Sequence, residues 1–303
     1  MKVAYLVVAH SNPQLLKREI HLLSSGDCAF FIHVDQKSNI EEFNEIRGEN
    51  VFFSERRLPV YWGGFSVVQA VLLLLQQALD RRDKFDYCVL LSGSNYPLRS
   101  GKYIHTFLKE NRGVEFMNIV RIPNEERGMP LSKINRFWFE PDKPIRRLVT
   151  RILAKLGLAQ RDHRKYLGSL EPYAGDMWWA LTKDACQYVL EFVERNPQVE
   201  KYFQTTAAPD EMFFHTILGN SAFASRIQRS LYYQDWSAHG LHPAVIDDRH
   251  VALFETQDKV WLDDIWGSGE ALFTRKLSDE RLDLAQRIDD LIARKDNGGT
   301  VRG

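Results

Sequence analysis

The sequence predicts an α/β protein in which a mostly parallel central sheet carries helices on both faces. Two features of the first half of the chain support this prediction. Continuous apolar runs alternate with segments of helical periodicity, as expected for strands that are covered on both faces. Polar residues follow each run directly, as at the strand ends of such sheets. With 303 residues, 44% of them hydrophobic, the chain is long enough to bury a large core.

The expected strands of the first half are the apolar runs at residues 3–8, 29–34, 51–53 and 87–91. Ser11-Asn12-Pro13 supplies a cap and a proline suited to a helix start. The clearest helix follows Gly63-Gly64, where apolar residues recur at helical spacing; they are Val67, Ala70, Val71, Leu74, Leu75 and Ala78.

The second half is more irregular and richer in aromatic residues. We expect helices at residues 146–156, 185–193, 209–218 and 277–295, and a strand at 177–181. Residues 171–175 are expected to form a loop, 232–240 a strand end with a loop, and 298–303 a disordered tail. No linker composition marks a boundary, so residues 1–303 are interpreted as one domain. Within it, 1–120 form the nucleotide-binding half, 121–277 the acceptor and catalytic half, and 278–303 a C-terminal helix and tail.

The composition excludes some classes of function. Lys and Arg together number 40, as do Asp and Glu, so a general nucleic-acid binder is not expected. The three cysteines, Cys28, Cys88 and Cys186, lie in apolar runs without metal-ligand spacing and are expected to be reduced and buried. No signal peptide and no apolar stretch of about 20 residues is present, so we expect a cytoplasmic protein whose membrane contact is at most peripheral.

Because ligands of parallel sheets bind beyond the carboxyl ends of the strands, a nucleotide site is expected at that edge. His10, Asp35 and the Ser92 to Asn95 turn are placed there by the pattern of the runs.

Six segments together resemble the Branch family of glycosyltransferases, which includes the core-2/I-branching β-1,6-N-acetylglucosaminyltransferases and the peptide O-xylosyltransferases. They occur in the family's order and read AYLVVAH at 4–10, HVDQKSN at 33–39, WGG at 62–64, LSGSNYPL at 91–98, PDEMFFHT at 209–216 and LFTRK at 272–276. The second and fifth are closer to the xylosyltransferase branch.

The resemblance implies a GT-A-like fold and an inverting transfer from a UDP-sugar, carrying xylose or N-acetylglucosamine, to a hydroxyl of a glycan or glycoconjugate. It implies no divalent metal and no other cofactor. The sequence agrees, because no two aspartates are separated by a single residue, the spacing with which metal-dependent relatives of this fold hold their ion.

Arg275-Lys276 match the family's diphosphate-binding residues and would offset the charge on the departing UDP. Their local alternative is a solvated basic pair. Glu211 matches the catalytic glutamate and would take the proton of the attacking hydroxyl. At an expected helix start, its local alternative is a first-turn acid that favours the helix dipole.

The remaining site residues are assigned in two groups. UDP-sugar contacts are expected at Val8, His10, Asp35, Trp62, Ser92 and Asn95. Many relatives carry an aspartate at the position of Asn95. The local alternative for Trp62 is a place in the core. Acceptor contacts are expected at Trp179, Asp210 and Trp236, with one of Trp178 and Trp179 in the core because adjacent strand residues point to opposite faces. Lys133 and Arg136 would share one helix face, which is expected to be solvated; contact with the acceptor is the alternative.

Two other functions were weighed. A dinucleotide-dependent oxidoreductase requires a glycine-rich turn after the first strand, and Ala9-His10-Ser11-Asn12-Pro13 contains no glycine, so it is rejected. A non-catalytic UDP-sugar- or glycan-binding relative remains the alternative.

Residues 143–156 place six apolar side chains at helical spacing beside five basic ones, which are Lys143, Arg146, Arg147, Arg151 and Lys155. Arg161, Arg164 and Lys165 follow. Such a helix either packs on the core with its charges solvated, attracts an anionic acceptor, or lies in the surface of an anionic membrane.

Overall fold

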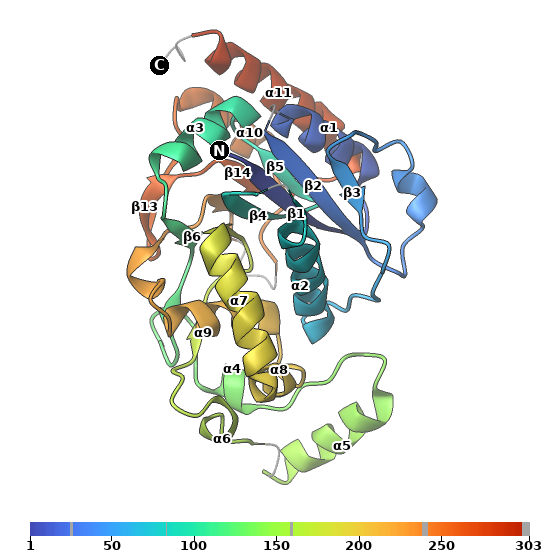
Figure 1. Ribbon diagram of the computed structural model, residues 1–303, viewed down its shortest axis with the longest axis vertical. Coiled ribbons are helices and arrows are strands. Elements are labelled where there is room, and N and C mark those ends of the chain that lie inside the picture. The colour runs from blue at the N-terminus through green and yellow to red at the C-terminus, as the bar shows by residue number, and fades with distance from the viewer. Residues whose placement is uncertain (25–26, 83, 158–159, 238–241, 299–303) are drawn as a thin grey trace.

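The computed structural model describes residues 1–24, 27–82, 84–157, 160–237 and 242–298. Its centre is a seven-stranded mixed sheet with helices on both faces (Figure 1). The strands, in spatial order, are β10 (Ile227–Gln228), β6 (Glu115–Met117), β9 (Trp179–Thr182), β4 (Tyr87–Ser92), β1 (Val3–Ala9), β2 (Cys28–Val34) and β3 (Val51–Phe53). Over the described residues, β9 alone runs antiparallel to its neighbours. The predicted α/β class with a mostly parallel sheet is confirmed.

The strands predicted in the first half are all present. β1 and β4 have almost completely buried side chains and β2 is buried throughout, as expected for strands covered on both faces. The strand order reverses at β1, because β2 and β3 lie on one side of it and β4 on the other. A reversal of this kind leaves a crevice at the carboxyl ends of the two diverging strands, here β1 and β4.

Smaller sheets complete the strand set. A three-stranded sheet joins β11 (Tyr232–Gln234), β14 (Phe273–Arg275) and β5 (Asn95–Pro97). Two-stranded sheets join β12 (Trp261–Asp264) to β13 (Gly267–Glu270), and β7 (Val120–Arg121) to β8 (Tyr173–Ala174). β8 therefore occupies part of the expected loop at 171–175.

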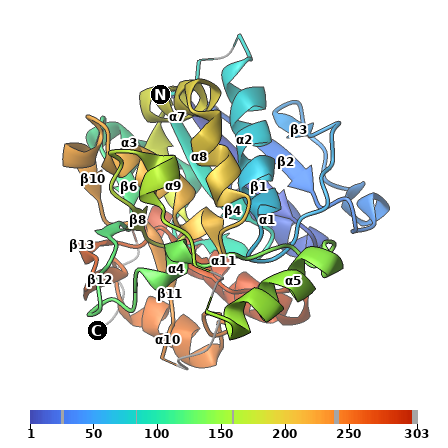
Figure 2. The same cartoon turned by 90° about the horizontal axis from the view of Figure 1, so that it is seen from below.

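The helices are α1 (Pro13–Leu23), α2 (Phe65–Leu79), α3 (Gly101–Glu110), α4 (Ser132–Asn135), α5 (Pro144–Lys155), α6 (Arg164–Leu167), α7 (Lys183–Arg195), α8 (Pro197–Phe203), α9 (Phe213–Gly219), α10 (Asp248–Thr256) and α11 (Leu282–Asp296). Short 3₁₀ turns are η1 (Ile40–Phe43), η2 (Pro209–Glu211), η3 (Ala224–Arg226) and η4 (Asp279–Arg281). α2 and α7 cover one face of the main sheet, and α1 and α3 cover the other (Figures 1 and 2).

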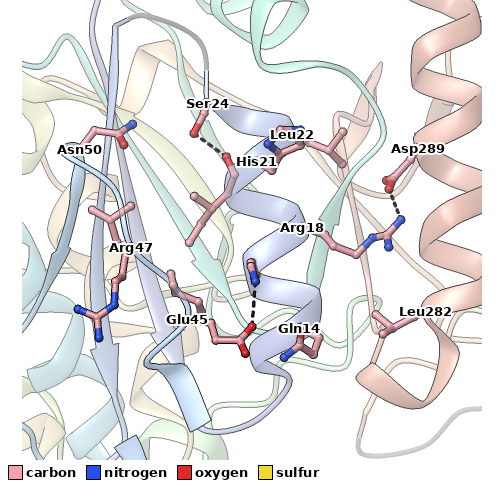
Figure 3. A pocket seen from close by; sticks show the side chains of 14 residues that line it. Gln14, Arg18, His21, Leu22, Ser24, Glu45, Arg47, Asn50, Leu282 and Asp289 are labelled. Atoms are coloured by element: carbon pink, nitrogen blue, oxygen red, sulfur yellow. Dashed lines mark hydrogen bonds and ion pairs between the residues drawn. The ribbon is translucent and has the colours of Figure 1, made fainter. Parts of the chain in front are cut away.

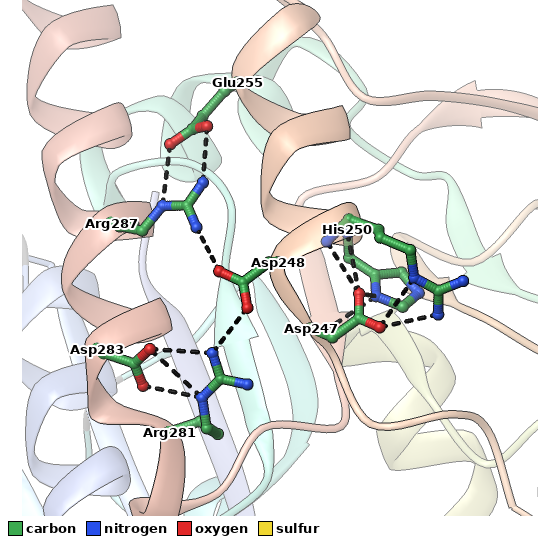
Figure 4. A network of polar contacts seen from close by, with 8 residues as sticks. Asp247, Asp248, His250, Glu255, Arg281, Asp283 and Arg287 are labelled. Carbon is green, nitrogen blue, oxygen red and sulfur yellow. Dashed lines mark hydrogen bonds and ion pairs between the residues drawn. The ribbon is translucent and has the colours of Figure 1, made fainter.

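A second hydrophobic cluster lies between α1, α10 and α11 and includes Leu15, Tyr96 and Phe254. Ion pairs link the exposed sides of these two helices. Arg281 and Arg287 of the α11 side both bind Asp248 of α10, at 3.1 and 2.8 Å (Figure 4). This layer holds the C-terminal part of the chain against α1.

Several local predictions were wrong for identifiable reasons. Asn12 adopts a left-handed conformation and does not cap α1; the Asp279 carboxylate instead accepts hydrogen bonds from the Gln14 and Leu15 amides at 3.2 and 2.8 Å. The helix expected from Pro209 is interrupted at Met212, between η2 and α9. The expected helix at 277–295 starts as η4 and becomes α-helical only at Leu282.

Other outcomes concern the surface and the cysteines. The three cysteines are buried and none is in a disulfide bond within the described residues, as predicted. Helix α5 has no buried residue, so the expectation that it packs on the core is wrong. The expected tail at 299–303 and loop residues 238–241 lie outside the described residues. No helix in the described ranges is long and apolar enough to cross a membrane.

Arg161 was grouped with the exposed basic residues by sequence, but the structure buries it. Its guanidinium donates to the Tyr202 carbonyl at 3.0 Å, to Thr205 Oγ1 at 2.6 Å and to the Ile134 carbonyl at 3.3 Å. It also lies 3.8 Å from the centre of the Tyr202 ring. Arg161 therefore joins α4 to α8.

We expect Arg161→Met to lower the free energy of unfolding by about 2–4 kcal/mol, because the hydrogen bonds that the buried guanidinium makes to two carbonyls and to Thr205 would be lost, together with its contact with the Tyr202 ring. Urea denaturation of Arg164→Met provides the control, since Arg164 is exposed on α6 and its loss should change stability by less than about 0.5 kcal/mol. Equal stability of the two variants would contradict the assignment.

Candidate donor and acceptor site

The carboxyl ends of β1, β2 and β4 meet at one edge of the main sheet, as the sequence predicted. Val8 of β1 is directly opposite Ser92 of β4, and Ala9 is opposite Val34 of β2. The Asp35 amide donates to the Ala9 carbonyl at 2.8 Å. Val8, His10, Asp35 and Ser92 therefore lie together at the edge where the strand order reverses, the place where a crevice is expected.

Asp35 organises the loops beside this crevice. Its Oδ1 accepts hydrogen bonds from the Lys37 and Val60 amides, and its Oδ2 accepts from Lys37 Nζ at 2.6 Å. Burial alone would raise the pKa of Asp35, but the bonds from Lys37 and Val60 outweigh it and lower that pKa. Asp35 is thus ionised and mostly engaged with protein groups, while contact with a donor stays a prediction.

His10 is exposed at the mouth of the crevice. Its pKa is lowered by burial of the ring; Asp35 opposes this shift, and Lys276 and Lys37 add to it. Although Lys276 is distant in sequence, it therefore lies close enough to act electrostatically on a residue at the end of β1.

Asn95 shapes the Ser92–Pro97 turn from inside. It is fully buried, and its Oδ1 accepts hydrogen bonds from the amide and the hydroxyl of Ser92 at 2.8 and 2.6 Å. The prediction that Asn95 contacts the donor is therefore not supported, because its side chain is inaccessible. An amide fits this role, since its oxygen accepts without adding a buried charge.

The three-stranded sheet brings Arg275 and Lys276 to the crevice. Arg275 pairs with Asn95 in the antiparallel register of β14 and β5, and the Leu277 amide donates to the Ser94 carbonyl at 3.0 Å. The Arg275 guanidinium lies 4.2 Å from the centre of the Trp178 ring. The basic pair is therefore fixed by strand pairing, and the local alternative of a freely solvated pair does not hold. Contact of the pair with a diphosphate stays a prediction.

Neither of these two cations has a carboxylate within 4 Å among the residues that the structure describes. Arg275 Nε is buried without a hydrogen-bond partner. Burial lowers the pKa of Arg275 to about 10, although Asp176 partly opposes it; burial and Arg275 lower the pKa of Lys276. Two adjacent, partly desolvated cations without counter-ions are suited to a polyanionic ligand.

Glu211 lies at the end of η2, with about a third of its side chain exposed. Its carboxylate is 3.3 Å from Lys133 Nζ of α4, so Lys133 does not lie on the plain solvated face that the sequence suggested. The Gly175 amide donates to the Glu211 carbonyl at 2.9 Å and fixes the backbone before the break at Met212.

Two further carboxyl groups, those of Asp210 and Asp176, lie close enough to Glu211 to be affected by its charge. Burial raises the pKa of Asp210 to about 7, with the Glu211 charge adding to the shift, and it raises the pKa of Asp176 to about 6. Asp176 accepts hydrogen bonds from Asn118 Nδ2 at 2.7 Å and Gln234 Nε2 at 3.1 Å. The acceptor assignment of Asp210 stays a prediction.

The Trp62-Gly63-Gly64 turn connects the two sides of the site. Gly63 has a φ of +68° and its carbonyl accepts from the Ala208 amide at 2.9 Å, directly before η2. The Glu140 carboxylate accepts from the Ser66 amide at 2.9 Å at the start of α2. A Cβ at Gly64 would lie 2.2 Å from this carboxylate, so only glycine fits there.

The tryptophans are distributed differently from the prediction. Trp62 is 67% exposed, so its core alternative is wrong and its contact with the donor stays a prediction; its ring contacts His242 at 5.1 Å between centroids. Trp179 is fully buried against Phe214, so its assignment to the acceptor is wrong. Trp178 is buried too, beneath Arg275. Trp236 is 46% exposed and remains available for an acceptor.

Sequence reasoning missed Glu140 and Asp176 and underestimated Lys133. Asp176 was identifiable in principle, since an aspartate between glycine and an apolar run often ends a loop. Glu140 carried no local signal, because the amide that it binds, that of Ser66, lies on a distant helix.

Comparison with known proteins identifies the family. A model of the family described as Core-2/I-Branching enzyme matches residues 3–257, which is most of the chain. The chain belongs to this family. Xylosyltransferase 2 of Mus musculus is 28% identical over 247 residues, and xylosyltransferase 1 of Rattus norvegicus is 24% identical over 246. Each alignment covers 78% of this chain, and it covers 27% and 28% of the relatives, so the chain spans little more than a quarter of their length.

A solved structure of mouse xyloside xylosyltransferase 1 in its apo form is similar at a TM-score of 0.35 and 10% identity. The alignment covers 90% of this chain and 97% of that one.

Outside this site, the branching-family chain has a cavity of about 600 Å³ between α1, the segment before β3, and α11 (Figure 3). Lys17–Glu45 and Arg18–Asp289 ion pairs line it, and none of the candidate site residues does. Among the described residues, no three His, Cys, Asp or Glu side chains form a group that could hold a metal ion.

The raised pKa of Asp210 predicts a pH dependence of stability in this branching-family chain. The carboxyl group titrates near 4 when unfolded and at about 7 when folded, so its ionisation destabilises the fold progressively between about pH 4 and pH 7. Asp210→Asn should therefore raise the free energy of unfolding by about 1–3 kcal/mol at pH 8, with the gain disappearing near pH 4. Urea denaturation at several pH values measures this.

The control is Asp142→Asn, which changes an exposed aspartate outside the site. Its difference from the unmodified protein should not depend on pH. A gain for Asp210→Asn that is equally large at pH 4 and pH 8 would contradict the prediction.

Proposed function

We propose that this chain is a glycosyltransferase of GT-A-like arrangement that moves xylose or N-acetylglucosamine from a UDP-sugar to a hydroxyl of a glycan or glycoconjugate, with inversion and without a metal ion. The observation that carries the proposal is the basic pair Arg275-Lys276, partly desolvated and without carboxylate partners in the described structure. Membership in the branching-enzyme family and the names of the xylosyltransferase relatives support it.

The diphosphate of the donor is assigned to Arg275 and Lys276. Arg275 offers an unpartnered Nε–H, and its plane is already fixed on Trp178. A guanidinium held in this way binds phosphate oxygens at little cost in side-chain entropy. Charge that develops on UDP as the bond to the sugar breaks would be stabilised by both cations, which is the role that a metal ion has in other transferases.

Glu211 is assigned as the general base. Asp176 and Asp210 interact electrostatically with both Arg275 and Glu211, but Asp176 is engaged by Asn118 and Gln234, and Asp210 has a pKa raised to about 7. Glu211 is the most accessible and faces Lys133. In the proposed step the acceptor oxygen attacks C1 of the sugar, its proton passes to the Glu211 carboxylate, and the bond from C1 to UDP breaks.

Glu211→Gln should keep the fold and the affinity for UDP while lowering turnover by roughly 10²–10⁴-fold, since the amide cannot accept the proton. The assay is UDP release from UDP-xylose and from UDP-N-acetylglucosamine with candidate acceptors. Glu110→Gln, on the exposed side of α3, is the matched control. Turnover near that of the control would remove Glu211 from this role.

Lys276→Ala should weaken UDP binding by roughly 10- to 100-fold, because a charge-assisted contact is lost, whereas Lys109→Ala on α3 should have no effect. Calorimetry or thermal shift with UDP measures the affinity. Turnover is expected to continue in excess EDTA. Inactivation by EDTA that Mn²⁺ reverses would show that the metal-free part of the proposal is wrong.

A further inference from the structure

Helix α5 projects from the body of the protein (Figures 1 and 2). None of its residues is buried, although its sequence alternates apolar and polar residues at helical spacing. The exposed apolar side chains are Ile145 (77% exposed), Leu148 (59%), Val149 (48%), Ile152 (51%) and, directly after the helix, Leu156 (65%). An isolated helix of this length is marginal in water, so an apolar stripe left uncovered points to a partner surface.

The polar residues of this helix have a single sign of charge. Lys143, Arg146, Arg147, Arg151 and Lys155 are basic, and residues 143–156 contain no Asp or Glu. At 100° per residue, Arg151 and Lys155 border the apolar stripe on one side and Arg146 borders it on the other. Basic side chains on both edges of an apolar stripe can reach phosphates while the stripe enters the acyl region.

The same charges argue against a second copy of the chain as the occupant. Two α5 helices packed along their apolar stripes would bring basic edges together with no acid on either helix to compensate. An anionic bilayer supplies the missing counter-charge, and its acyl region covers the apolar side chains.

We propose that α5 lies in the interface of an anionic lipid bilayer and attaches the protein to it reversibly. This inference stands independently of the proposed reaction. Arg164 and Lys165 of α6, both exposed and at the same end of the molecule, extend the basic surface (Figure 1).

The base of α5 is fixed to the candidate site, so the bilayer would lie on a defined side of the protein. Glu140 binds the Ser66 amide and is 3.5 Å from Lys143, the residue before α5. The Trp138 amide donates to the Thr205 carbonyl at 2.9 Å, and its ring lies beside Gly63. A membrane bound by α5 would therefore be held against the side of the protein where residues 138–143 contact the start of α2 and Thr205.

Vesicle flotation tests the proposal without any activity measurement. The protein should float with vesicles of phosphatidylglycerol and phosphatidylcholine at ~0.05 M salt, remain unbound to phosphatidylcholine alone, and be released at ~0.5 M salt, where the charges are screened. Arg147→Glu with Arg151→Glu should lower the partition coefficient at least about 10-fold. Ile145→Ser with Ile152→Ser should abolish flotation at low salt.

The control is Lys102→Glu with Lys109→Glu on α3, which makes the same change in net charge on exposed residues at the other end of the molecule and should leave flotation unchanged. Circular dichroism and UDP binding check that each variant is folded. Failure to float at low salt, or equal flotation of the α5 and α3 charge variants, would overturn the proposal. A dimer in light scattering that Ile145→Ser with Ile152→Ser dissociates, without flotation, would assign the stripe to a second copy instead.

Discussion

The arrangement of the site depends on one hydrogen bond, which the Ser66 amide on the first turn of α2 donates to the carboxylate of Glu140. The amides at the start of a helix require acceptors, and Gly64 at the N-cap has no side chain to supply one. Glu140 fills this need from a distant segment and thereby joins the segment between α4 and α5 to the start of α2. The Gly63 carbonyl then holds Ala208, so the same turn positions the backbone that leads to Glu211.

The cations and the carboxyl groups of the site are not paired directly. Arg275 and Lys276 have no carboxylate partner within 4 Å in the described structure and have lowered pKa values, whereas burial raises the pKa values of Asp176 and Asp210. If these groups had been paired directly, the cations would be neutralised and would have little affinity for an anion. The protein instead tolerates an electrostatic cost inside a site that a charged ligand would relieve, which is common at functional centres.

The sequence was sufficient for features that depend on local pattern. Apolar runs located β1 to β4, helical spacing located α2, and short motifs located Glu211 and the basic pair. It was insufficient where distant segments meet. The cap of α1 comes from Asp279, the break at Met212 follows from the bond between Gly175 and Glu211, and Trp179 is buried by α9. Each of these outcomes depends on tertiary contacts that no window of the sequence contains. The exposure of α5 was likewise unpredictable, because periodicity shows that a stripe exists but not what covers it.

Asp279 caps the N-terminus of α1, and this has a consequence for the order in which the protein folds during translation. The bond from the Leu15 amide to this carboxylate spans 264 residues, and Arg275 reaches the site only when β14 pairs with β5. β1, β2 and β4 can associate while synthesis continues, but Arg275, Lys276 and Asp279 are made together, long after β4. A nascent chain that ends before residue 275 therefore carries all seven strands of the main sheet without the basic pair and without the side-chain cap of α1.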